Sequence, residues 1–171
     1  MREAACTRAA WRCPTAQLVA AGALALALGA LVYLADRNPT HAALIPTVPA
    51  LAGLRLFGTA GAWLPSLVHP FAFSLFTAAL APPGARPAYW ACAMWWAVNI
   101  AFEIAQAPGV NADVAEALSQ LLGQTWLANA LSNYLLRGTC DVADLVAATA
   151  GAVAAGAVLR FIHLRQTRHA R

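Results

Sequence analysis

The sequence contains no lysine and few charged residues of either sign. Charged residues make up 11% of the 171 positions and hydrophobic residues 61%, whereas soluble domains average roughly 25% and 45–50%. A soluble domain of this size could not bury such an apolar excess. The eleven arginines give a net charge of +4, but they lie between and beside hydrophobic runs instead of clustering on one face, as nucleic-acid binding requires. The composition therefore argues against a soluble domain and against a nucleic-acid partner.

Cysteine is scarce, and the spacings typical of metal or catalytic centres are absent. Cys6, Cys13, Cys92 and Cys140 form neither a CxxC pair nor a Cys/His zinc pattern. The sequence also contains no HExxH or GxSxG motif. We therefore expect no metal, no cofactor and no disulfide framework, and we interpret the cysteines as apolar filler.

Four apolar runs are long enough to cross a bilayer, since a spanning helix needs about 20 residues. The predicted spans are residues 17–35, 62–80, 87–106 and 139–162. The sequence thus predicts an all-α, polytopic membrane protein with a single membrane domain over residues 1–171. A cleaved signal peptide is the alternative interpretation of the first run, but that run exceeds the usual apolar core of roughly 7–15 residues.

Two longer polar segments separate these spans. Residues 36–61 contain prolines and charges that a lipid-exposed helix cannot hold, so we expect an outer loop there. In residues 111–135, apolar side chains such as Val114 and Leu118 recur at helical spacing opposite polar ones. This pattern predicts one outer amphipathic helix between the third and fourth spans, with Asn111 as its N-cap.

The arginines indicate how the spans are oriented. Most of them flank the first span on its N-terminal side, occupy the short turn at Arg86, or lie at and beyond the end of the fourth span. The two longer segments also hold Arg37, Arg55 and Arg137, but acidic residues accompany them there. Because cytoplasmic flanks hold the positive excess, we expect both termini in the cytoplasm, with residues 163–171 as a basic cytoplasmic tail.

Six polar residues fall near the outer ends of the predicted spans on this topology. They are His69, Glu103, Gln106, Arg137, Asp141 and Asp144. An Asp in apolar surroundings costs about 2.5–3.5 kcal/mol on insertion scales, so such residues usually face the bundle interior or water. The pattern predicts a ligand-binding site between the helices. In the fourth span, the small residues Ala148, Gly151 and Ala155 follow at helical spacing and predict close helix packing.

A structural interpretation of the same residues stays open. Asp141 and Asp144 in a first helical turn favour the helix dipole, and Arg137 could pair with one of them. His69 could satisfy a backbone group at a kink before Pro70.

Three motifs occur in one order along the chain. They are LVHPFAFSLFTAAL with His69, Phe71 and Phe73, FEIAQ with Glu103 and Gln106, and RGTCDVADLVAATAG with Arg137, Gly138, Asp141, Asp144 and Gly151. Together they resemble the VanZ-like family of small bacterial membrane proteins. The sequence departs from the family pattern where Pro65 and Ser66 replace an acidic-basic pair, where Ala148 replaces an Asn, and in the length of the segment after Gln106.

The resemblance implies a multi-pass protein of the bacterial cytoplasmic (inner) membrane. The residues themselves leave three functions open. The first is binding of an envelope lipid or related anionic ligand, with Arg137 receiving the headgroup and the other polar residues orienting it. The second is a structural or assembly role with a homo-oligomeric or membrane protein partner. The third is an intramembrane enzyme with Asp141 or Glu103 as base and His69 as acid.

Overall fold

The computed structural model describes residues 14–36, 54–82 and 85–169, with side chains of the last helix described up to Leu164. These residues form helices and turns without a strand, which confirms the all-α prediction. The helices are α2 (Pro14–Ala35), α3 (Ala60–Leu80), α4 (Ala85–Ala105), α5 (Val110–Leu122), α6 (Trp126–Arg137) and α7 (Val142–His169). The first two cysteines and residues 37–53 of the expected outer loop lie outside the described residues.

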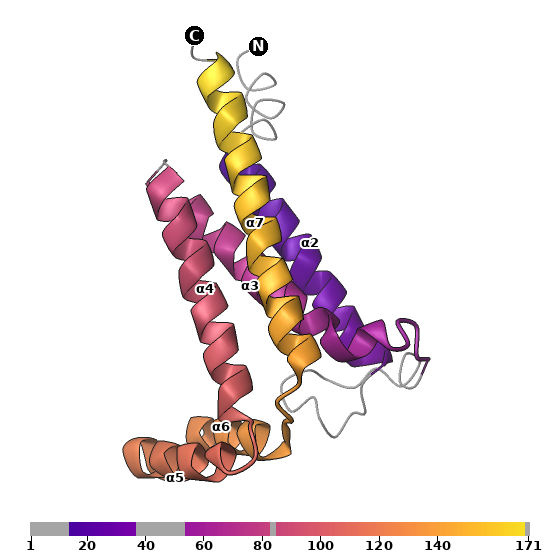
Figure 1. The fold of residues 1–171 in the computed structure, drawn as a ribbon, viewed down its shortest axis with the longest axis vertical. Coiled ribbons are helices and arrows are strands. Elements are labelled where there is room, and N and C mark those ends of the chain that lie inside the picture. Colours follow the sequence, from indigo (N-terminus) through magenta and orange to yellow (C-terminus); the bar gives the residue numbers. More distant parts are fainter. Residues whose placement is uncertain (1–13, 37–53, 83–84, 170–171) are drawn as a thin grey trace, which may run out of the picture.

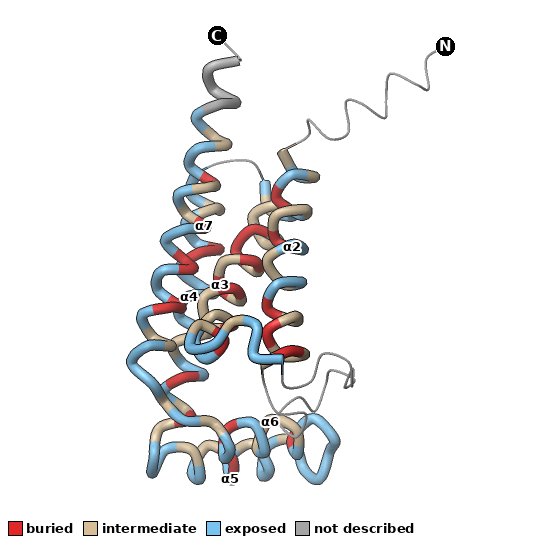
Figure 2. The backbone as a smooth tube through the Cα atoms, turned by 90° about the vertical axis from the view of Figure 1, so that its right-hand side faces the viewer, coloured by how far each residue is buried: buried red, intermediate tan, exposed pale blue. Residues whose placement is uncertain are grey.

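Helices α4 and α7 run close to the long axis of the molecule and α2 and α3 are inclined to it, whereas α5 and α6 lie across one end (Figure 1). We call this end the hairpin end, and we call the opposite end, where α2 begins and α7 ends, the basic end. Helix α3 is central, since it packs against α2, α4 and α7, and α4 also packs against α7. The buried residues lie along the inner faces of these helices (Figure 2).

Three helices of the described chain are long and apolar enough to cross a membrane. They are α2, α3 and the Val142–Leu164 part of α7. Three of the four predicted spans therefore qualify by length and composition, and the predicted third span does not. The predicted third span corresponds to α4, which has 21 residues but combines three tryptophans with Asn99 and Glu103. Indole and polar side chains keep its hydropathy below that of the three qualifying segments.

The segment between α4 and α7 contains two amphipathic helices instead of the one predicted. Gly123 breaks the helix, because its backbone (φ 65°, ψ −160°) is a conformation that only glycine adopts readily. Thr125 then caps α6 by accepting a hydrogen bond from Ala128 N at 3.2 Å. The prediction of Asn111 as the N-cap is also wrong, since α5 begins at Val110 and Gly109 is its N-cap.

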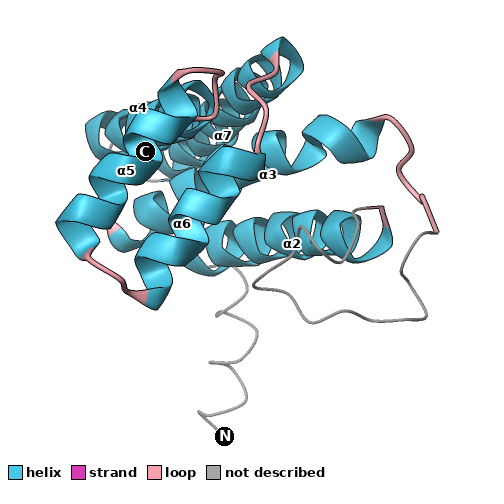
Figure 3. Ribbon diagram, turned by 90° about the horizontal axis from the view of Figure 1, so that it is seen from below, coloured by secondary structure: helices cyan, strands magenta, loops and turns pink. Residues whose placement is uncertain are grey.

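These two helices form an antiparallel hairpin, seen from the hairpin end in Figure 3. Ser132 Oγ in α6 donates a hydrogen bond to Ala115 O in α5 at 3.4 Å. The hairpin leaves large apolar side chains exposed, among them Leu121, Trp126 and Leu127.

The last helix differs from its predicted bounds at both ends. It begins at Val142, three residues later than predicted, because Asp141 is in a capping position. It continues to His169, so most of the predicted tail 163–171 is helical.

The core depends on small residues in α7, as predicted. Ala148 and Ala155 are fully buried, and Gly151 is also buried. A Cβ atom on Gly151 would lie 2.9 Å from the Leu67 carbonyl carbon and 3.1 Å from Pro70 Cγ. The backbones of α3 and α7 therefore approach to a separation that only glycine allows at this position. Nearer the basic end, the core cluster consists of Leu18, Leu75, Cys92, Ala155 and Leu159.

Candidate functional site

Charged side chains are divided between the two ends of the described bundle. All six carboxylates that the structure describes belong to segments at the hairpin end, where α2 and α4 end and α3 and α7 begin (Figure 1). They are Asp36, Glu103, Asp113, Glu116, Asp141 and Asp144. At the basic end, the described ionisable residues of α4 and α7 are Arg86, Arg160 and His163, with Tyr89 nearby.

Gln106 joins the end of α4 to the segment that leads into α7. Its side chain is only 6% exposed, and Nε2 donates a hydrogen bond to Phe102 O at 3.3 Å. A Cβ atom on Gly138 would overlap the Gln106 amide, so this position admits only glycine unless Gln106 moves. The contact brings the predicted site residue Gln106 against the residue that directly follows Arg137.

Asp144 links α7 to α3. Ser66 Oγ donates a hydrogen bond to Asp144 Oδ1 at 2.7 Å, and both side chains are half-buried. Ser66 lies one helical turn before His69 and directly before the first family-like motif, so the bond connects this part of α3 to the third motif. Sequence reasoning noted Ser66 only as a departure from the family pattern, although its i, i+3 spacing from His69 was a usable signal.

Asp141 serves its own helix. The side chain is exposed, and its Oδ1 accepts a hydrogen bond from Ala143 N at 2.9 Å. The Asp141 carbonyl oxygen accepts from Asp144 N at 3.1 Å and from Leu145 N at 3.2 Å, which is the geometry of an N-cap. The structural interpretation therefore accounts for Asp141.

Arg137 and Glu103 differ sharply in burial. Arg137 is exposed in the last turn of α6, where a cation interacts favourably with the helix dipole. Glu103 is only 8% exposed, two residues before the end of α4. Its burial supports the prediction that this carboxyl group faces the bundle interior.

His69 stands at the edge of an aromatic row between α3 and α4. Its ring stacks on Phe73 with centroids 6.1 Å apart, and Phe73 stacks on Trp95 at 4.7 Å. Trp95 Nε1 donates to Thr77 Oγ1 at 2.8 Å, and Asn99 Nδ2 donates to Trp95 O at 2.8 Å. Trp95 therefore packs between α3 and α4, and Asn99 is used within its helix.

The hairpin end thus has polar contacts of two kinds. Gln106 and Asp144 join separate segments, whereas Asp141 caps its own helix. Among the described residues, no three His, Cys, Asp or Glu side chains gather as a metal site requires. An anionic group at this carboxylate-rich end would form its strongest hydrogen bonds with a cation, and Arg137 is an exposed cation next to the Gln106 contact.

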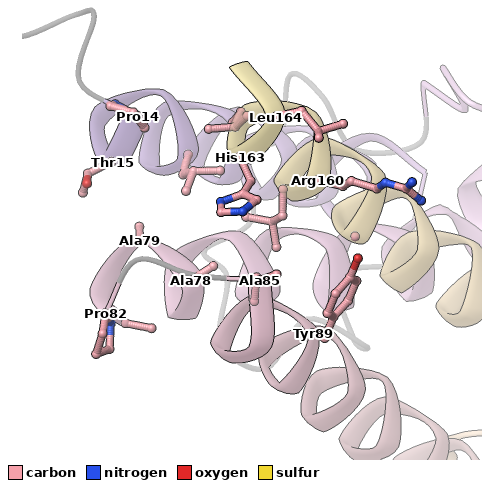
Figure 4. Close-up of a pocket in the computed structure, with 16 residues that line it drawn as sticks. Pro14, Thr15, Ala78, Ala79, Pro82, Ala85, Tyr89, Arg160, His163 and Leu164 are labelled. Carbon is pink, nitrogen blue, oxygen red and sulfur yellow. The ribbon is translucent and has the colours of Figure 1, made fainter. Parts of the chain in front are cut away.

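A cavity of about 520 Å³ lies at the opposite, basic end of the bundle. Residues of α2, α3, α4 and α7 line it (Figure 4). None of the described lining residues is one of the six predicted site residues. Sequence reasoning missed this cavity because Arg160 and His163 were interpreted only as parts of a basic flank.

Comparison with protein-family profiles, with curated proteins and with solved structures finds no match to this chain. The resemblance to the VanZ-like family therefore stays a prediction from the three motifs.

Proposed function

We propose that this chain is a four-span protein of VanZ-like type in the bacterial inner membrane, and that its hairpin end binds the headgroup of an envelope phospholipid. Helix α4 is the fourth span in this proposal. Its 21 residues match the length of a crossing helix, and it packs along both α3 and α7. Its polar side chains are accommodated, since Glu103 is buried and Asn99 bonds within the helix.

The orientation in this proposal follows from the separation of charge. Arg86 and Arg160 are at the basic end, which therefore faces the cytoplasm by the positive-inside rule. The hairpin end then lies at the outer leaflet. Helices α5 and α6 cross the bundle axis there (Figure 1) and expose Trp126 and Leu127, as helices lying in a membrane interface do.

The observation that carries the lipid-binding proposal is the position of Arg137. Its exposed side chain ends α6 directly before Gly138, which packs on Gln106. A lipid phosphate would form charge-assisted hydrogen bonds with the guanidinium group. Hydroxyl or ammonium groups of the same headgroup would donate to nearby carboxylates such as Asp141, so a headgroup with both phosphate and donors suits this end.

The test is native mass spectrometry of protein extracted with its lipids. We compare wild type with Arg137→Gln and with a matched control, Arg55→Gln, which removes another exposed cation from the hairpin end. Loss of one interfacial cation weakens lipid binding by about 1 kcal/mol, or roughly fivefold. We expect this loss in Arg137→Gln alone. Equal lipid retention in the wild type and Arg137→Gln would rule out the headgroup role.

A structural role is the second candidate, and the bond between Ser66 and Asp144 favours it. In this case the polar residues fix how α3 and α7 align, through hydrogen bonds between helices. Ser66→Ala would then lower stability while leaving the lipid complement unchanged. The same lipid measurement separates the two candidates.

A further inference from the structure

The cavity at the basic end combines an apolar floor with a cationic rim. Its floor shares Leu18 and Leu159 with the core cluster, and Ala78, Ala88 and Gly156 complete it. Arg160, His163 and Tyr89 come from the two helices that border the floor (Figure 4). One ligand could therefore touch hydrocarbon and charge at the same time.

The charge of the lining selects an anion. No Asp or Glu occurs among the described residues that line the cavity, and all the described carboxylates belong to the other end of the bundle. The described lining thus offers no carboxylate, the ligand that hard cations such as Ca²⁺ and Mg²⁺ take. Arg160 is exposed and His163 half-buried, so the guanidinium group and the imidazole both remain accessible to a ligand.

The size of the cavity fits part of a lipid. At about 520 Å³, it lies within the roughly 300–1,000 Å³ of typical small-molecule sites. It can hold a headgroup and the first part of an acyl chain, with the remainder of the chains in the bilayer. A free phosphate ion would leave the apolar floor uncovered.

We propose that this cavity is a second lipid site, which takes an anionic glycerophospholipid from the leaflet at the basic end. The phosphate lies at Arg160 and His163, and an acyl chain covers Leu18, Ala88 and Leu159. This inference is independent of the headgroup proposal for Arg137, because the two sites share no residue and lie at opposite ends of the helices.

The experiment uses the full chain in nanodiscs of mixed phosphatidylglycerol and phosphatidylcholine. Native mass spectrometry then counts each lipid released with the protein. Arg160→Gln should reduce phosphatidylglycerol retention about fivefold, the effect of one interfacial cation, and His163→Gln should reduce it further. Arg86→Gln is the matched control, since Arg86 is an exposed cation at the same end but is not among the described lining residues.

A second variant tests the cavity without changing charge. Ala85 lines the cavity and is exposed, so Ala85→Phe can fill space without displacing buried atoms. We expect Ala85→Phe to lose the retained phosphatidylglycerol while keeping the thermal stability of wild type.

Three outcomes would overturn the proposal. Equal losses in Arg86→Gln and Arg160→Gln would indicate a general charge effect. Equal retention of phosphatidylcholine and phosphatidylglycerol by wild type would exclude selection of an anion. Full displacement of the lipid by inorganic phosphate at matched concentration would indicate a soluble phosphate ligand. Arg137→Gln should leave this site intact, so failure here and failure of the headgroup proposal remain distinguishable.

Discussion

Substitution of Gly151 by alanine tests whether close approach of α3 and α7 holds the bundle together. These two helices pack extensively against each other. The new Cβ atom would meet the Leu67 backbone, including its carbonyl carbon at 2.9 Å. Backbone atoms cannot swing aside as a flexible side chain can, so the helices must separate.

The expected magnitude follows from a matched substitution in the same helix. Overpacking in a core costs about 1–3 kcal/mol, while Gly→Ala in a helix gains about 1 kcal/mol from propensity. Gly156→Ala has the same propensity gain, but its Cβ would lie 4.0 Å from the nearest atom, Cys92 Sγ. The Gly151→Ala protein should therefore be less stable than the Gly156→Ala protein by about 1–3 kcal/mol.

The assay is unfolding of the detergent-solubilised variants, followed by tryptophan fluorescence and helical circular dichroism. Trp95 and Trp96 report on this region because they bond to Thr77 in α3 and Thr149 in α7. If Gly151→Ala proved as stable as Gly156→Ala, the close backbone approach would not be a source of stability, and the reasoning would fail.

Two further predictions concern the hairpin end. In a double-mutant cycle of Ser66→Ala and Asp144→Ala, we expect a coupling free energy of about 1.5–3 kcal/mol, as for a hydrogen bond to a charged group; strictly additive losses would show that the bond does not contribute. Gly123→Ala should strain the turn between α5 and α6 by about 1–3 kcal/mol, since φ is 65° and ψ −160° there. Hydrogen exchange should then speed up in both helices and stay unchanged in α2, and unaltered exchange in the hairpin would contradict the prediction.

The helix content and the positions of the long helices could be predicted from sequence. In lipid, a long apolar run satisfies its backbone hydrogen bonds within its own segment only as a helix. Helix α4 also forms close to its predicted residues, but three tryptophans, Asn99 and Glu103 make it too polar to count among the qualifying spans. The hairpin was predicted as one helix because its apolar spacing continues across Gly123. Periodicity reports which face is apolar, but a single glycine decides where the chain turns.

The candidate site was only partly accessible from sequence. Burial of Glu103 and Gln106 was predictable from their shared helix face near the end of an apolar run. The partner of Asp144 was not, because Ser66 lies 78 residues away and nothing local marks the pair. Similarly, a structural role for Asp141 in the first helical turn was one of two open alternatives, and the backbone geometry shows such a role, as the N-cap of α7.

By itself, the sequence determined an Ala-rich, arginine-flanked set of apolar helices with polar residues at the ends, since composition and local periodicity act within one helix. Only the tertiary structure decided that Gly151 admits the Leu67 backbone, that Gly138 admits Gln106, and that Arg160 and His163 border a cavity. These features depend on distances between helices, which arise from packing of side chains far apart in the chain and have no signal in any single segment.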